Sequence, residues 1–255
     1  MRNLACCFLL VAIVTGCSAG YEVASVTGTR VLIDHRFDTP KVAEAEAFLE
    51  PYRHKVDSLM SPVVGRTATY MAAERPESSL SNLMADILVW DARRYGDPVD
   101  LAVYNIGGIR AALPEGNVTI GDLLEVAPFE NKLCVVTLTG DRLQQLFSQI
   151  ASTGGEAVSH GVELCITKNG RLVSAKLNGQ AVDPQRNYRI ATIDYVAQGN
   201  DGMTAFKHSE KLNMPQRSGE SIRSDINEYF RELTRKGKMA ESNVEGRIKI
   251  VEDRR

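Results

Sequence analysis

The hexapeptide Asn-Ile-Gly-Gly-Ile-Arg at residues 105–110 most constrains how this chain folds, because it directly follows an apolar run. That run, residues 101–104, is predicted to be a buried strand. Adjacent glycines at a strand end allow a positive φ and a close approach of the backbone to another object. Asn105 offers both a donor and an acceptor, and Arg110 offers a planar set of charged donors. The stretch suits either a loop that holds a polar or anionic ligand, or an ordinary glycine turn with a solvated arginine.

The overall composition is that of a globular protein. The chain has 255 residues, of which 44% are hydrophobic and 24% charged, enough for one large domain or two small ones. The net charge of −2 provides no basic surface for a nucleic acid polymer. The sequence contains no run with zinc-ligand spacing, no Gly-x-Ser-x-Gly motif and no Gly-x-x-x-x-Gly-Lys loop. A self-contained hydrolase is therefore not predicted.

The N-terminus has the pattern of an export signal. Arg2 precedes an apolar run at residues 4–14 that is too short to span a bilayer but suits a signal-peptide core. The run ends in Val-Thr-Gly-Cys, which resembles the bacterial lipoprotein box and would place acyl chains on Cys17. We therefore expect an exported, membrane-anchored lipoprotein on the periplasmic side, at the outer membrane. An ordinary secretory signal and a buried N-terminal helix are the alternatives.

The rest of the chain mixes strands and helices without strict alternation, which predicts an α+β fold with a mixed sheet and packed helices. The expected organisation is a signal peptide at 1–16, a tether, strand and linker-like helix at 17–60, and one domain at 61–252. The helix is expected to turn one apolar face to a core and to kink or break at Pro51. Further expected elements are strands at 30–34 and 67–70, a helix from Ser78, a hairpin at 162–177, a strand at 188–193, a helix near 218–233 and a strand at 246–251.

Two cysteines remain beyond the signal region, Cys134 and Cys165, each in an apolar strand-like run. An export compartment permits a disulfide. Two separate buried thiols are the alternative reading, since sequence alone does not show whether the strands are adjacent.

Three loop segments that follow strands or helices carry groups suited to a ligand. Phe129 follows a proline that stiffens its backbone, and Tyr195 stands at a strand end. Two aromatic side chains on separate loops are able to stack on both faces of a flat base. Asp201 is able to accept hydrogen bonds from ribose hydroxyls. In the alternative reading, the two rings belong to the core and Asp201 belongs to a turn.

Five motifs, in this order and spacing, resemble those of the C-terminal domain of the 5′-nucleotidases. They are ES-x-L-x-NL-x-AD at 77–86, N-x-GGIR at 105–110, PF-x-N at 128–131, LTG at 138–140 and G-x-DG at 199–202. The resemblance covers most of the chain beyond the N-terminal segment. It implies a nucleoside-binding domain whose substrate contacts are Asn105, Gly107, Gly108, Arg110, Phe129, Asn131, Tyr195 and Asp201.

The resemblance also assigns roles to these residues. Phe129 and Tyr195 stand at the two aromatic positions that sandwich the base, Asp201 at the ribose acceptor and Arg110 at an arginine that contacts the nucleotide. Asn105 and Asn131 match polar residues near the base. Catalytic residues and two divalent metals belong to a calcineurin-like metallophosphatase domain, so this chain is expected to bind no metal or cofactor itself.

Three departures from the family pattern bear on the site. Ile106 stands where the family often has a third glycine, and Gly199 and Asn200 stand where it has two glycines. A further substrate arginine of the family falls at Glu74 by strict spacing, with Arg75 one residue away.

Three functions follow as alternatives. The first is the substrate-binding subunit of a split 5′-nucleotidase, which would act with a separately encoded metallophosphatase on a nucleoside monophosphate. The second is a nucleoside-binding lipoprotein without an enzymatic partner. In the third, the fold is kept and its loops bind another protein.

Overall fold

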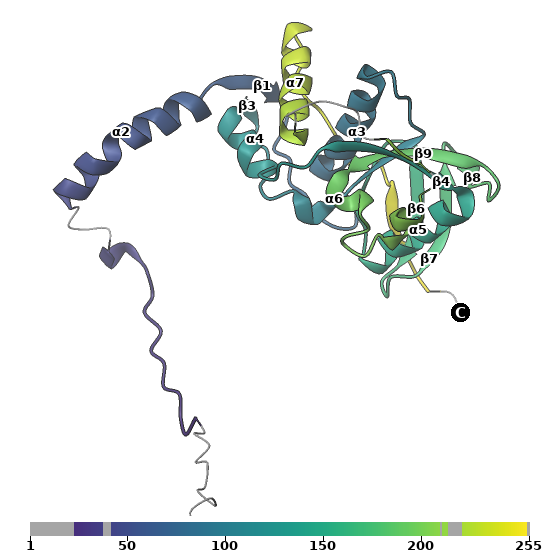
Figure 1. Cartoon of the computed structure of the whole chain (residues 1–255), viewed down its shortest axis with the longest axis horizontal. Coiled ribbons are helices and arrows are strands. Elements are labelled where there is room, and N and C mark those ends of the chain that lie inside the picture. The colour runs from purple at the N-terminus through teal and green to yellow at the C-terminus, as the bar shows by residue number, and fades with distance from the viewer. Residues whose placement is uncertain (1–22, 38–41, 210, 214–220, 254–255) are drawn as a thin grey trace, which may run out of the picture. The chain divides into compact units, whose positions relative to one another are not determined.

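The computed structural model describes residues 23–37, 42–209, 211–213 and 221–253 (Figure 1). It divides into two compact units, Met1–Glu50 and Pro51–Arg255, and each is considered by itself. In the first unit, residues 23–33 form no helix or strand, so the strand predicted at 30–34 is wrong. The apolar side chains of this predicted strand, Val31, Leu32 and Ile33, are exposed. A strand needs a paired neighbour and an apolar face to cover, and no pairing is described for this segment. A 3₁₀ helix, η1, follows at His35–Phe37.

Helix α2, Ala43–Met60, crosses the boundary between the two units. It continues through Pro51, so the helix does not break there. None of its side chains is buried, which corrects the expectation that its apolar face packs on a core. That face is 42–66% exposed and consists of Phe48, Leu49, Tyr52, Val56 and Leu59.

The described part of the second unit contains three sheets. Antiparallel pairs dominate, but β2 (Leu101–Tyr104) pairs with β9 (Asn187–Ile193) in parallel, and so does β11 (Ile248–Val251) with β6 (Val162–Thr167). The predicted mixed sheet is therefore confirmed. The predicted hairpin is β6–β7. The five-stranded sheet has the order β10 (Lys211–Asn213), β4 (Leu133–Thr139), β9 (Asn187–Ile193), β2 (Leu101–Tyr104), β5 (Ala157–Val158). The four-stranded sheet has the order β11 (Ile248–Val251), β6 (Val162–Thr167), β7 (Leu172–Leu177), β8 (Gln180–Ala181), and the third sheet pairs β1 (Val63–Thr67) with β3 (Gly116–Thr119).

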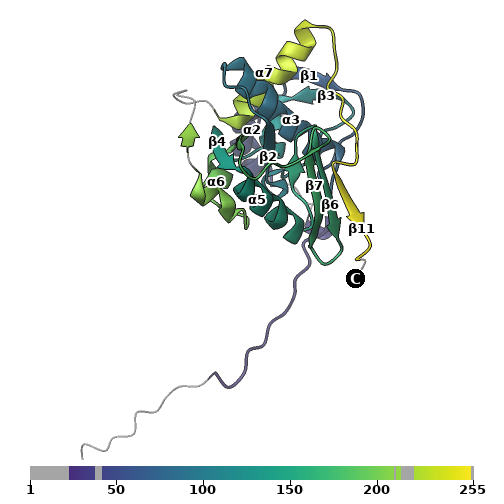
Figure 2. The same ribbon diagram turned by 90° about the vertical axis from the view of Figure 1, so that its right-hand side faces the viewer.

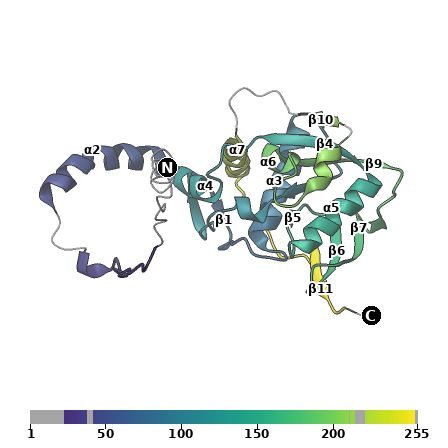
Figure 3. The same ribbon diagram turned by 60° about the horizontal axis from the view of Figure 1, so that its bottom comes forward.

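Helices cover these sheets and complete the α+β fold. Helix α3 (Ser79–Arg94) packs against β2 and β5, and α5 (Gly140–Ser152) packs against β4 and β7. Helix α7 (Ile222–Arg235) packs against β1 (Figures 1 and 2). Strand β10 lies at the outer edge of the five-stranded sheet, beside β4 (Figure 3). None of the helices described is long and apolar enough to cross a membrane. The helices are α3 (Ser79–Arg94), α4 (Ile120–Val126), α5 (Gly140–Ser152), α6 (Asp194–Ala197) and α7 (Ile222–Arg235), with 3₁₀ turns η2 (Ile106–Gly108) and η3 (Thr204–His208).

Helix α3 forms as its local sequence predicts. The Ser78 side chain caps the N-terminus by accepting a hydrogen bond from the backbone N–H of Ser81, and the Ser81 hydroxyl accepts one from the backbone N–H of Ser78. The buried stripe follows the helical repeat and consists of Leu80, Leu83, Met84, Ile87 and Leu88.

The first strand of the second unit begins earlier than predicted. It is Val63–Thr67, so the strand predicted at residues 67–70 is wrong in its bounds. A side chain at Gly65 would place its Cβ 2.8 Å from the ring of Phe230. Helix α7 therefore packs directly on the backbone of β1, and this long-range contact fixes where the strand lies.

Candidate functional site

The three loops with ligand-type residues meet because of the strand order in the five-stranded sheet. Strands β2 and β9 are parallel neighbours, so Asn105 and Tyr195, which follow them, emerge at the same edge. Strand β4 is antiparallel to β9, with Leu133 opposite Ile193, so the segment before β4 begins at this edge too. Mutual hydrogen bonds between Lys132 and Asp194 join that segment to the start of α6.

The Asp201 carboxylate is the centre of this edge. Asn105 Nδ2 donates to Asp201 Oδ2 at 2.7 Å, and the Tyr195 hydroxyl donates to Asp201 Oδ1 at 2.9 Å. Asp201 has a φ of 51°, in the left-handed region that aspartate tolerates in turns. The hydrogen bond to Asp201 and its charge raise the pKa of the Tyr195 phenol, which favours the neutral hydroxyl as donor.

The two glycines of the hexapeptide have different roles. Gly107 is exposed beside Asp201. Gly108 is buried, and a Cβ there would lie 2.7 Å from Asn105 Oδ1. Gly108 therefore leaves room for the Asn105 side chain. The Oδ1 atom of Asn105 is itself buried and has no hydrogen-bond partner within the described ranges.

Arg110 is exposed at the end of the same loop. Its Nη1 donates to the carbonyl of Gly107 at 3.2 Å, and its backbone N–H donates to the carbonyl of Val126 at 2.9 Å. The second bond ties the glycine loop to the segment that carries Phe129.

Phe129 and Tyr195 are both solvent-accessible, with 48% and 39% of their surface exposed, so neither is a core residue. The Asn131 carbonyl accepts a hydrogen bond from the backbone N–H of Ile222 at 2.7 Å. Exposed aromatic rings are costly in water and are well suited to stacking on a flat ligand.

A buried carboxylate that sequence reasoning missed supports the glycine loop. Glu156 is 2% exposed, and its Oε2 accepts a hydrogen bond from the backbone N–H of Ile106 at 2.6 Å. Its other oxygen pairs with Arg75, whose Nε also donates to the carbonyl of Gly155 at 2.8 Å. Arg75 is thus engaged in holding the loop. A single glutamate between two glycines and two apolar residues matches no motif, so the sequence does not indicate that Glu156 is buried or that it supports the loop.

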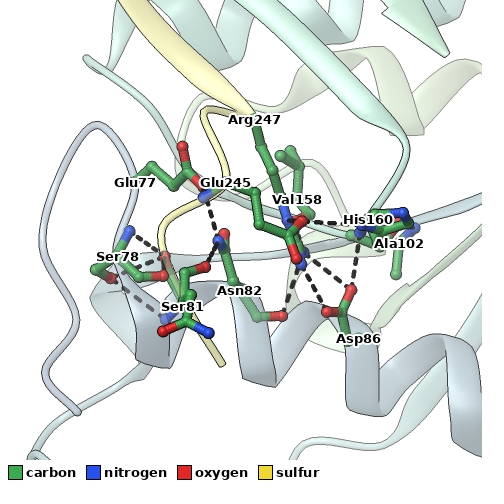
Figure 4. Close-up of polar contacts among 12 residues, drawn as sticks. Glu77, Ser78, Ser81, Asn82, Asp86, Ala102, Val158, His160, Glu245 and Arg247 are labelled. Atoms are coloured by element: carbon green, nitrogen blue, oxygen red, sulfur yellow. Dashed lines mark hydrogen bonds and ion pairs between the residues drawn. The ribbon is translucent and has the colours of Figure 1, made fainter. Parts of the chain in front are cut away.

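The family motif at residues 77–86 also has a structural role. Arg247, in the segment before β11, donates to both carboxylate oxygens of Asp86 at 2.9 and 2.7 Å, and its Nε donates to Glu245 at 3.0 Å (Figure 4). Glu77 accepts bonds from Asn82 and from the backbone N–H of Glu245. The motif therefore binds α3 to the C-terminal segment.

Cys134 and Cys165 are free thiols, so the reading as separate thiols is confirmed and the disulfide is not formed. Only Cys134 is buried, which corrects the expectation that both would be. Burial and the charge of Asp194 raise the pKa of the Cys134 thiol to about 12. Among the residues with described positions, no group of three or more His, Cys, Asp or Glu side chains is arranged to hold a metal ion.

Comparison with known proteins identifies the family. The model of the 5′-nucleotidase C-terminal domain matches residues 61–208, more than half of the chain. The chain belongs to this family. It is 30% identical over 240 residues to the trifunctional nucleotide phosphoesterase YfkN of Bacillus subtilis, covering 86% of this chain and 16% of the relative. It is 26% identical over 170 residues to UshA of Escherichia coli, covering 64% of this chain and 31% of UshA.

The fold agrees with this membership. The crystal structure of a 5′-nucleotidase precursor from Thermus thermophilus matches with a TM-score of 0.71 and 28% identity, covering 83% of this chain and 44% of that one. The chain therefore spans less than half the length of these relatives. This family is that of the substrate-binding domain of nucleotidases.

Proposed function

We propose that this domain binds the base and ribose of a nucleoside monophosphate for hydrolysis by a separately encoded calcineurin-like metallophosphatase. The observation that carries the proposal is the convergence of Asn105 and Tyr195 on the Asp201 carboxylate, beside an exposed glycine and an exposed arginine. An acidic acceptor beside an aromatic ring and amide groups matches the chemistry of a nucleoside, which offers ribose hydroxyls and a flat base.

In this proposal each group has one task. Phe129 and Tyr195 stack on the two faces of the base, and Asp201 accepts hydrogen bonds from the ribose hydroxyls. Asn105 and Asn131 lie near the polar edge of the base, and Arg110 contacts the phosphate. The two divalent metals, held by the partner, would activate the attacking water. This chain contributes by fixing the orientation of the nucleotide relative to that water.

We further propose that Cys17 is lipidated and that the domain is held on the periplasmic side of the outer membrane. The lipoprotein-like motif supports this proposal, and it lies outside the described residues. Mass spectrometry of the protein from a membrane fraction tests it: a diacylglyceryl modification at Cys17 is expected, and it should be lost in Cys17→Ser.

The binding proposal is tested by titration calorimetry of adenosine and AMP into the purified protein without added metal. Micromolar binding is expected, with affinity reduced at least about tenfold in Phe129→Ala and in Asp201→Ala. Val173→Ala is a matched control, because Val173 has the same 48% exposure as Phe129 but lies on β7. Binding that persists unchanged in both site variants would contradict the proposal.

The catalytic part of the proposal needs a second measurement. AMP hydrolysis by a candidate metallophosphatase is expected to rise when this protein is added, and Phe129→Ala should abolish the increase. Nucleoside binding without any such increase would instead favour a receptor function without an enzymatic partner.

A further inference from the structure

The segment that carries Phe129 has little regular structure to hold it. Helix α4 ends at Val126 and β4 begins at Leu133, so residues 127–132 belong to no helix or strand. Pro128 has no N–H to donate. If the loop that carries a stacking ring has to be ordered when the ligand binds, the entropy cost lowers the affinity of the protein for that ligand. Something outside this loop therefore has to fix it.

Arg223, on the first turn of α7, contacts the loop on both sides of Phe129. Its Nη1 donates to the carbonyl of Ala127 at 3.0 Å and to that of Pro128 at 3.2 Å. Its Nη2 pairs with the carboxylate of Glu130. The Arg223 side chain is 22% exposed and its bond to the Ala127 carbonyl is partly buried, whereas the Glu130 side chain is 71% exposed. The bonds to the carbonyls are therefore the inner part of this contact, and the ion pair is its outer part.

The N-terminal turn of α7 is held in place by packing and by a backbone hydrogen bond. Ile222 and Ile226 are buried in the core, and the backbone N–H of Ile222 donates to the carbonyl of Asn131 at 2.7 Å. Arg223 therefore extends from a rigid helix, and its planar fork reaches two carbonyls and a carboxylate at once.

We infer that Arg223 is a positioning residue for nucleoside binding, which holds Phe129 in place to stack on the base. The inference rests on the proposed function for its effect on affinity, but the position of the ring is measurable without ligand. The matched comparison is Arg231, on the same helix, which is exposed and whose Nε donates to Asn227 Oδ1 at 3.1 Å one turn away.

The first experiment reads the ring directly. With 4-fluorophenylalanine at position 129, the ¹⁹F resonance of the ligand-free protein should move towards the random-coil shift in Arg223→Gln and stay in place in Arg231→Gln. Glu130→Ala removes one of the contacts from an exposed side chain and should give a smaller shift in the same direction. If Arg223→Gln does not fold, the Glu130 variant takes its place, and an unchanged ¹⁹F resonance in it would overturn the inference. An unchanged resonance in folded Arg223→Gln would overturn the inference.

The second experiment measures adenosine affinity. Arg223→Gln is expected to weaken binding by about tenfold, within the range for losing one stacking partner, and Arg231→Gln should bind normally. In the Phe129→Ala background, Arg223→Gln should have no further effect. Equal weakening in both backgrounds would mean that Arg223 does not act through Phe129. If the wild type binds no nucleoside, the proposed function fails, and the ¹⁹F result alone decides whether Arg223 positions the ring.

Discussion

Asp86→Ala is expected to destabilise the protein more than Arg247→Met, although both substitutions break the same ion pair. The Arg247 side chain is 3% exposed, whereas the Asp86 side chain is 36% exposed. Without Asp86, a buried cation loses its bidentate partner. Without Arg247, the carboxylate that remains is reached by water. The cost of each substitution therefore depends on which charge stays behind.

The magnitudes follow from the contacts. Removing one partner of a buried pair costs about 3–5 kcal/mol. We expect about 3 kcal/mol for Asp86→Ala, the low end, because Asp86 is partly solvated and Glu245 remains 3.0 Å from Arg247 Nε. Arg247→Met keeps an apolar side chain of similar length but leaves the Val158 carbonyl without its donor at 2.8 Å, which costs about 1 kcal/mol.

Urea unfolding followed by circular dichroism measures both values, provided that the dependence on urea is the same for each variant. Arg171→Met is the control, because its pair with Asp253 is 53% and 42% exposed and should contribute less than about 1 kcal/mol. If Arg247→Met costs as much as Asp86→Ala, the argument from unequal burial is refuted.

Three further predictions concern the site and the cysteines. Tyr195→Phe keeps the stacking ring but removes a donor that competes with ribose for Asp201, so adenosine should bind more tightly by calorimetry; weaker binding would mean that the hydroxyl itself contacts the ligand. Glu156→Ala leaves a buried backbone N–H of the glycine loop without its acceptor and should lower the free energy of unfolding by about 2 kcal/mol, and an unchanged urea midpoint would show that water replaces the carboxylate. At pH 8, iodoacetamide should alkylate Cys165 much faster than Cys134, whose pKa of about 12 keeps it a thiol; raising the pH towards 12 should accelerate Cys134, and equal rates at pH 8 would contradict its burial.

Local sequence was sufficient where local interactions decide the structure. Ser78 caps α3, and the apolar repeat that follows is buried as predicted, because capping and helical spacing are read within a few residues. The polar loops at residues 105–110 and 195–201 were also identified, because glycines and ligand-type side chains follow strands.

Long-range packing was not readable from the sequence. The parallel pairing of β2 with β9, which brings Asn105 to Asp201, depends on strand order. Arg223 and Glu156 are single charged residues without a motif. The partners of Arg223 lie 93 to 96 residues away in the chain, and those of Glu156 lie 50 and 81 residues away. The strand predicted at 30–34 failed for a related reason, since an apolar run forms a strand only where a neighbour pairs with it.

The pairing of β2 with β9 also has a consequence for how the protein folds. The hydroxyl of Thr192 donates to the carbonyl of Val103 at 2.8 Å across 89 residues of chain. Contacts between such distant segments form slowly, after local helices and hairpins. The ligand groups assemble only when these strands have joined, so a nucleoside cannot template the early steps of folding. Under the proposed function, a nucleoside therefore stabilises only the folded domain and does not bind the unfolded chain.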